Sequence, residues 1–194
     1  MNKEQHTEIP LREIVPEYNS NNFLVRSLFN KRQKIASYYI HRIKPNRILD
    51  LGCGDGSFVK IIKYRFTNIK IFGVDVNPNV VKLNKIFNEK IFSRQDLLNL
   101  SFKKDSFDVV VCLDVLEHIK NLDDALKEIK RILIKNGYLI TSEPTENFLY
   151  KTLRFLYKGT YSEKEGPEAG AHYSNAKEID KVIKNSGFKK LDNK

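Results

Sequence analysis

A glycine-rich segment in the first third of the chain has the residue types of a site for a nucleotide cofactor. The segment Arg47–Phe58 reads Arg-Ile-Leu-Asp-Leu-Gly-Cys-Gly-Asp-Gly-Ser-Phe, an apolar strand pattern that runs into alternating glycines and then a helical pattern. Glycine lets the backbone approach a ligand where a Cβ would collide, and a helix N-terminus exposes free N–H groups. The segment therefore predicts a cofactor bound against a strand-to-helix turn.

The spacing of these glycines disfavours NAD. A dinucleotide fingerprint has the form G-x-G-x-x-G, whereas Gly52, Gly54 and Gly56 alternate. Asp50 stands two residues before the first glycine, where a carboxylate would repel a pyrophosphate. The same carboxylate suits a ligand that carries an ammonium group and a positively charged sulfur, as S-adenosylmethionine (SAM) does.

Acidic residues recur at later strand ends. Asp75 closes the apolar segment Ile69–Asp75, at about 20 residues after the glycines, where a carboxylate can accept hydrogen bonds from both ribose hydroxyls. Asp96 follows a further short strand pattern, and the apolar segment Phe107–Leu113 leads into a loop that contains His118. Two alternatives remain open: Asp75 caps a helix that begins at Pro78, and Asp96 is only a turn residue.

These segments, in this order and spacing, resemble the class I SAM-dependent methyltransferases from Arg47 to Phe188, in a form common among enzymes that act on small molecules. The resemblance implies methyl transfer from SAM to an O, N or C atom of a small-molecule acceptor, with a lipid-linked acceptor included. Two alternatives stay open, a SAM-binding regulatory module without turnover and a methyltransferase acting on RNA or protein. The cofactor-binding residues that it implies are Asp50, Gly52, Cys53, Gly54, Gly56, Asp75, Val76, Asp96, Leu97 and Leu113.

His118 is the predicted catalytic residue. It follows the fourth strand pattern, and an unperturbed histidine pKa near 6.5 suits a general base that takes a proton from a hydroxyl or carbon acceptor. The alternative is a histidine that caps the backbone at a helix entry. Glu117 is expected to be structural, while Glu143, His172 and Tyr173 are expected on the substrate side of the site.

Composition limits the class of protein. At 194 residues the chain predicts one domain. Cys53 and Cys112 form no disulfide framework, and no Cys-x-x-Cys or Cys/His cluster predicts a metal. The segment Met1–His6 leads into no apolar stretch long enough for a signal peptide or membrane span. We therefore expect a soluble, cytoplasmic protein without a metal.

A net charge of +10 raises the question of nucleic acid. The lysines are spread along most of the chain, and Leu113–Leu116 stands where methyltransferases of exocyclic base amines carry an Asn/Asp-Pro-Pro-aromatic run. Nucleic acid is therefore not the expected acceptor.

Alternating strand and helix patterns predict a doubly wound α/β fold with a mostly parallel sheet flanked by helices. The expected helices are Phe23–Arg42, Ser57–Tyr64, Pro78–Asn88, Asp123–Lys135 and Lys177–Asn185. The expected strands are Arg47–Leu51, Ile69–Asp75, Lys90–Arg94, Phe107–Leu113 and Gly137–Glu143. Gly137 is expected as the C′ glycine of the fourth helix, and Asn175 with Glu178 as a capping box for the last.

Segments outside the sheet are expected to set specificity. We divide the single domain 1–194 into an N-terminal cap region (1–45), a cofactor-binding core (46–143), a lid insertion (144–173) and a C-terminal helix with the start of an edge strand (174–194). The lid pattern is basic and amphipathic, so peripheral membrane contact is a second role for it. The resemblance implies seven strands, of which the last two are short or missing here, so a homodimer or the N-terminal segment is expected to cover the open edge.

Overall fold

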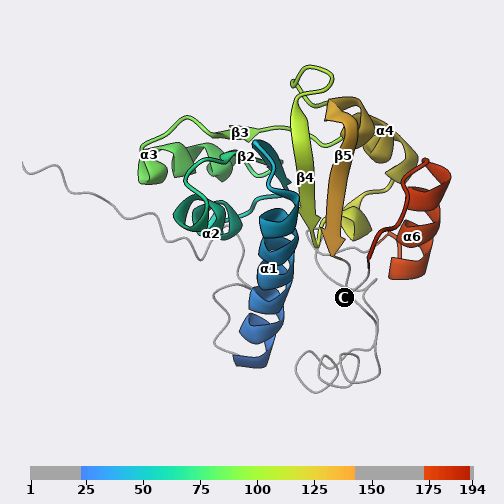
Figure 1. Cartoon of the computed structure of the whole chain (residues 1–194), viewed down its shortest axis with the longest axis horizontal. Helices are drawn as coiled ribbons and strands as arrows, with labels where there is room; N and C mark the ends of the chain where they lie inside the picture. The colour runs from blue at the N-terminus through green and yellow to red at the C-terminus, as the bar shows by residue number, and fades with distance from the viewer. Residues whose placement is uncertain (1–22, 143–172, 193–194) are drawn as a thin grey trace, which may run out of the picture.

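The structure is a computed structural model that describes residues 23–142 and 173–192. The described strands form one parallel sheet in the order β3-β2-β1-β4-β5 (Figure 1). Its strands are β1 (Arg47–Leu51), β2 (Lys70–Asp75), β3 (Phe92–Arg94), β4 (Phe107–Leu113) and β5 (Leu133–Ser142). The helices are α1 (Phe23–Ile43), α2 (Ser57–Arg65), α3 (Leu83–Phe87), α4 (Leu122–Ile132) and α6 (Ala176–Asn185), with short 3-10 turns η2 (Pro78–Lys82) and η3 (Leu116–His118). The predicted doubly wound α/β fold is confirmed.

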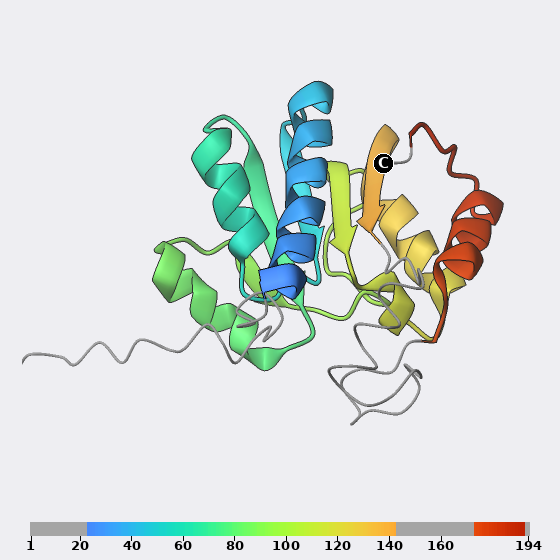
Figure 2. The same cartoon turned by 90° about the horizontal axis from the view of Figure 1, so that it is seen from below.

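The sheet separates two apolar cores. Strand β4 is apolar on both faces because both are covered: Val109 and Val111 face α1, α2 and α3, while Val110 and Cys112 face α4 and α6. Figure 2 shows these two groups of helices lying apart from each other. Continuous apolar strands of this kind are typical of parallel sheets. Because all the strands are parallel, their carboxyl ends lie together along one edge of the sheet and their amino ends along the opposite edge.

Local signals set several helix ends. Asn77 is the N-cap of η2, with Pro78 as the first helical residue. Asn175 and Glu178 form the predicted capping box of α6, and Gly187 follows that helix with φ 83°. The proposal that Asp75 caps the Pro78 helix is wrong, because the Asn77 side chain accepts the N–H of Asn79 there.

The end predicted for the fourth helix is wrong. Helix α4 stops at Ile132, because Leu133 pairs with Phe107 and starts β5. Gly137 lies inside β5 and is no C′ glycine. A Cβ there would lie 3.0 Å from the Ile134 carbonyl and 3.1 Å from the Asp108 carbonyl. The glycine therefore serves the irregular pairing of β5 with β4.

The observed bounds of other helices and strands also differ from the predicted ones. The expected helix Pro78–Asn88 is split into η2 and α3, and β3 begins at Phe92, two residues later than expected. Phe188 packs on the core beside α6, but residues 188–192 form no strand. Among the described strands, β5 pairs only with β4, so the outer side of β5 has no partner strand there. The homodimer expected to cover this side remains a prediction. The lid helix expected within 144–173 lies almost entirely outside the described residues.

Candidate active site

The loops that carry the predicted cofactor residues meet at the carboxyl edge of the sheet. Asp50 lies in β1 and pairs in register with Gly73 of β2 and Val111 of β4. The glycine loop follows directly and leads into α2, whose N-cap is Gly56. In open parallel sheets, ligands bind outside these carboxyl ends where the strand order reverses, which here lies between β1 and β4.

The glycine loop is held to the end of β2. The N–H groups of Gly52 and Cys53 both donate to the Val74 carbonyl, at 2.8 and 3.0 Å. The N–H of Gly54 donates to Oδ2 of Asp75 at 2.9 Å, and the N–H of Asn77 donates to Oδ1 of Asp75 at the same distance. Asp75 therefore joins two loops before any ligand binds. This double role explains why a carboxylate is needed at the end of β2.

All three glycines of the loop have positive φ, which other residues rarely adopt, and two of them also leave little room for a Cβ. Gly52 has φ 72°, and a Cβ built on it would lie 2.3 Å from Cγ2 of Val115. Gly56 has φ 73°, and its Cβ would meet Phe92 at 3.1 Å and Leu83 at 3.2 Å. The loop after β4 therefore packs directly on the glycine loop. Both glycines are required by the protein's own packing.

Asp50 is a buried carboxyl group with a free oxygen. Only 3% of the residue is exposed, and its Oδ2 has no hydrogen-bond partner among the described residues. Burial raises the pKa of Asp50 to about 8, with further contributions from the charges of Asp75 and Asp55. In the ligand-free protein this group is therefore mostly protonated at neutral pH. A cation beside Oδ2 would stabilise the ionised form.

Asp55 joins Asp50 and Asp75 around the loop, although the sequence did not single it out. It is 9% exposed, and its Oδ1 accepts the N–H of Ser57 at the start of α2. Cys53 lies between these acids, and burial together with the charges of Asp50 and Asp75 raises the pKa of its thiol. The thiol is therefore a packing group and not a nucleophile. The three carboxyl groups make this corner suited to a positively charged ligand.

The residues predicted for the adenine side occupy the ends of β2 and β3. Val76 follows Asp75 and is 62% exposed, while Leu97 is buried. Oδ1 of Asp96 accepts the N–H of Leu98, so this oxygen closes a turn, as the alternative interpretation of Asp96 predicts. Leu113 ends β4 and is almost fully buried. The exposed side chain of Val76 and the turn that contains Asp96 therefore lie near Asp75.

His118 closes the short turn η3 after β4. Its backbone N–H donates to the Val115 carbonyl at 3.0 Å, and its side chain is half-buried. The Tyr173 N–H donates to the Glu117 carbonyl at 2.8 Å, which brings the start of the final segment beside His118. Glu143 and His172, expected on the substrate side, lie outside the described residues.

Helix α1 contributes an ion pair that the sequence did not predict. Its Arg32 pairs with Oδ2 of Asp114, and the two side chains are 23% and 15% exposed. Asp114 has φ 56°, and its Oδ1 accepts the Ser142 hydroxyl at 3.1 Å. The ends of β4 and β5 are therefore tied to α1. Only the basic character of α1 could have indicated this, because an ion pair between distant segments leaves no local pattern.

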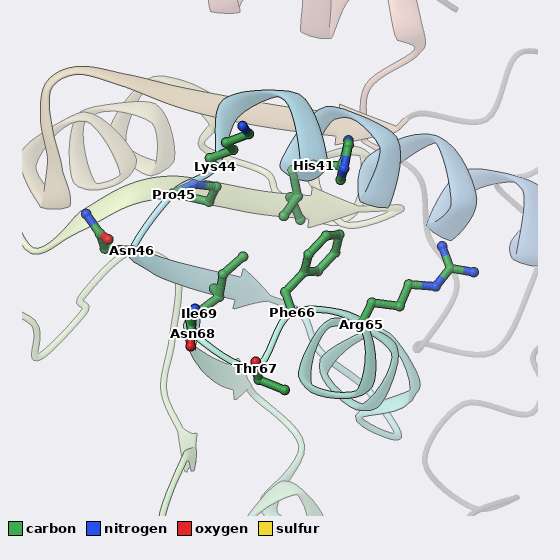
Figure 3. A pocket seen from close by; sticks show the side chains of 10 residues that line it. His41, Lys44, Pro45, Asn46, Arg65, Phe66, Thr67, Asn68 and Ile69 are labelled. Atoms are coloured by element: carbon green, nitrogen blue, oxygen red, sulfur yellow. The ribbon is translucent and has the colours of Figure 1, made fainter.

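A cavity lies at the opposite edge of the sheet, where the strands begin. It measures about 390 Å³ and lies between the end of α1 and the loop after α2, as Figure 3 shows. Its lining includes His41, Lys44, Arg65 and Phe66, and none of the predicted site residues. The cofactor residues predicted from the sequence therefore lie away from this cavity, at the carboxyl edge of the sheet.

Comparisons with known sequences identify the family of this chain. A family model described as a methyltransferase domain matches residues 18–193. An uncharacterized protein of Methanocaldococcus jannaschii is 38% identical over 104 residues, which cover 54% of this chain and 43% of that protein. The demethylmenaquinone methyltransferase of Bacteroides fragilis is 24% identical over 165 residues, which cover 80% of this chain and 67% of that enzyme. The chain thus spans less than half of the first relative's length.

Solved structures share the fold. A SAM-dependent methyltransferase of Thermotoga maritima matches with a TM-score of 0.57 and 25% identity over 74% of this chain and 64% of that chain. A SAM-dependent methyltransferase of Archaeoglobus fulgidus matches with a TM-score of 0.61 and 20% identity over 88% of this chain and 75% of that chain. Together with the family match over most of its length, these likenesses show that the chain belongs to the class I SAM-dependent methyltransferases.

Proposed function

We propose that this protein transfers the methyl group of SAM to a small-molecule acceptor at the carboxyl edge of the sheet. The observation that carries this proposal is the buried Asp50 carboxyl group, whose Oδ2 lacks a partner among the described residues beside the glycine loop. Leaving a buried polar atom unpaired costs about 1–3 kcal/mol, so such an atom needs an explanation. A bound ammonium group supplies one.

Each predicted residue then has a proposed part in holding SAM. Asp50 would pair with the ammonium group, and the glycine loop would allow close backbone approach. Asp75 already accepts N–H groups from both neighbouring loops, and a carboxylate has about four lone-pair sites, which leaves capacity for ribose hydroxyls. Val76 and Leu97 would border the adenine, with Asp96 at its edge. The site favours a cation, in agreement with the glycine spacing, which disfavours NAD.

SAM supplies an electrophilic methyl group on a positively charged sulfur. The protein's task is to orient the acceptor and exclude water, and orientation alone can lower a barrier by several kcal/mol, up to about 7–11. Where the acceptor is a hydroxyl or carbon, His118 would take the proton. Leu113 would border the methyl group, and the Arg32–Asp114 pair would keep the end of β4 in place.

A small-molecule acceptor is supported by the likeness to demethylmenaquinone methyltransferase, which covers 80% of this chain. More specifically, we propose a quinone-like, lipid-linked acceptor. It agrees with the sequence-based expectation of peripheral membrane contact. None of the helices in residues 23–142 and 173–192 is long and apolar enough to cross a membrane.

Isothermal titration with SAM, its demethylated product and NAD tests the cofactor part of the proposal. Micromolar binding of the first two and none of NAD is expected. Methyl transfer from radiolabelled SAM to a panel of quinols, amines and RNA then tests the acceptor class. Transfer to RNA alone would overturn the small-molecule proposal, and SAM binding without transfer to any acceptor would favour a regulatory module.

A further inference from the structure

Two of the described helices, α1 and α2, carry positive charge that no acidic residue of the same helices balances in residues 30–44 and 57–65. Residues 30–44 of α1 and its end, together with α2, contain eight Lys and Arg and no Asp or Glu. In α4 and α6, on the other face of the sheet, six Lys and Arg are balanced by five Asp and Glu. The lysines are spread along most of the sequence, but the carboxylates that could balance them are absent from residues 30–44 and from α2.

Among the described residues, most of these cations have no carboxylate partner. Arg32 pairs with Asp114 and Lys63 with Glu89. The other six pair with no carboxylate of the described residues, and all are exposed: Lys31, Lys34, Arg42, Lys44, Lys60 and Arg65. We call this set, with exposed Tyr38 and Tyr64, the α1–α2 basic face.

The two helices present this face together. Nε2 of Gln33 donates to the Ser57 hydroxyl at 2.9 Å, which joins the middle of α1 to the start of α2. From Lys31 to Arg42 the exposed stripe of α1 runs about 16 Å at 1.5 Å per residue. Cations in the last helical turn complement the helix dipole, but Lys31, Lys34 and Lys60 lie outside those turns and have no such structural role.

The uncharged residues of the basic face favour a nucleic acid over a lipid surface. A membrane-binding helix needs large apolar side chains to enter the acyl region, and the exposed large apolar residues described in α1 and α2 are only Tyr38 and Tyr64. Tyr64 is 89% exposed, and the Arg42 guanidinium lies 5.8 Å from the centre of the Tyr38 ring. Aromatic and arginine side chains in a basic surface are the features on which bases of single strands stack.

The cavity at the amino edge continues this face. It opens between the ends of α1 and α2 and brings Phe66 together with Lys44, Arg65 and the amide of Asn68 (Figure 3). An aromatic ring, two cations and an amide group can contact a base, its ribose and a phosphate. This edge is opposite the glycine loop, so nucleotides bound in the cavity are not placed for methyl transfer.

We propose that the α1–α2 basic face binds single-stranded nucleic acid, as a partner and not as the methyl acceptor. Binding follows from phosphate neutralisation by the six exposed cations, which pair with no described carboxylate, and from base stacking on Tyr38 and Tyr64. It is independent of the proposed function, because no residue of the basic face is among the proposed cofactor or catalytic residues.

Fluorescence anisotropy with a labelled 20-nucleotide poly(U) RNA tests this proposal over 50–200 mM KCl. The wild-type affinity should fall with salt, and the double variant Lys34→Glu/Lys60→Glu should bind at least tenfold more weakly. Its log–log salt slope should be smaller by about 1.4, since each phosphate contact on a single strand contributes about 0.7. Tyr64→Ala should weaken binding by about tenfold with an unchanged slope.

The matched control is Lys177→Glu/Lys181→Glu, which makes the same charge change at two exposed positions of α6. It should bind within twofold of wild type, while SAM affinity and Tm show that each variant is folded. Equal losses in both double variants would mean that net charge alone drives binding and would overturn the proposal. So would binding of anionic phospholipid vesicles without binding of RNA.

Discussion

The N–H of Gly54 donates to Oδ2 of Asp75 at 2.9 Å, so the end of β2 holds the glycine loop that follows β1. The other carboxylate oxygen holds Asn77, at the start of the next loop. One side chain thus positions the backbone on both sides of the proposed ribose site. A ligand that bonds to Asp75 joins a network that already exists.

Asp75→Ala should weaken SAM binding by about 1.5–3 kcal/mol, the range for hydrogen bonds to a charged group. Titration calorimetry measures the loss, and urea unfolding should show that the domain still folds. Asp75→Asn is the informative companion, because an amide oxygen can still accept one N–H while the charge is lost. Unchanged SAM affinity in both variants would remove Asp75 from the cofactor site.

Asp50→Asn should make the ligand-free protein more stable and SAM binding weaker. The folded-state pKa of Asp50, about 8, lies above the ordinary value of 3.8 for an aspartic acid. The stability that this carboxyl group contributes is therefore complete below pH 4 and is lost as the pH rises to 8. The Tm advantage of the variant should therefore grow between pH 5.5 and 8 and level off above. An advantage that does not change with pH would mean that Asp50 is ionised in the folded protein.

The same group predicts proton release on SAM binding. The ammonium group stabilises ionised Asp50, so the wild-type affinity for SAM should rise between pH 6 and 7, below the range of about 7.7–8.0 in which an α-amino group itself loses its proton. In Asp50→Asn this pH dependence should disappear. Titrations in two buffers of different ionisation enthalpy count the protons, and no release at pH 7 would contradict the proposed ammonium contact.

Gly52→Ala should destabilise the fold by about 1–3 kcal/mol, because a Cβ at this residue collides with Val115 and φ is positive. Gly187→Ala is the matched control: its φ is also positive, but the new Cβ would meet only the movable end of Lys130. Val115→Ala added to Gly52→Ala should restore part of the loss. Equal urea midpoints for the two glycine variants would show that the contact with Val115 is unimportant.

The Arg32–Asp114 pair should show a coupling energy of about 0.5–3 kcal/mol in a double-mutant cycle with Arg32→Met and Asp114→Asn. Both side chains are largely shielded from water, so the attraction is only weakly screened. The exposed pair Lys127–Asp124 should show no measurable coupling. The free energies of unfolding of the wild type, the single variants and the double variant give the coupling energy of each pair. Measuring them at 0.1 and 1 M NaCl shows how strongly salt screens each pair.

His118→Ala should lower kcat by about 10²–10⁴ for an acceptor that must lose a proton, without changing the affinity for SAM. The pH profile of kcat separates this role from a structural one, because loss of a base removes the acidic limb. A fall in SAM affinity and Tm with an unchanged profile would assign His118 to the turn η3.

The sequence alone determined the elements whose signals are local. These signals depend on neighbours within a few residues: alternating glycines after an apolar strand, acids at strand ends and the Asn175 capping box. For this reason β1, β4, α6 and the likeness to SAM-dependent methyltransferases could be predicted from the sequence. Helix α4 could not be delimited in this way, because the pairing of Leu133 with Phe107 ends it and that partner lies far away in the chain.

Only the tertiary structure decided the charge and contacts of the site. Asp50 was expected as a free carboxylate, but burial beside Asp75 and Asp55 raises its pKa, and burial is a property of the packed sheet. The Arg32–Asp114 pair and the concentration of positive charge on α1 and α2 have the same origin. They depend on which distant segments the fold brings together, whereas composition counts residues without placing them.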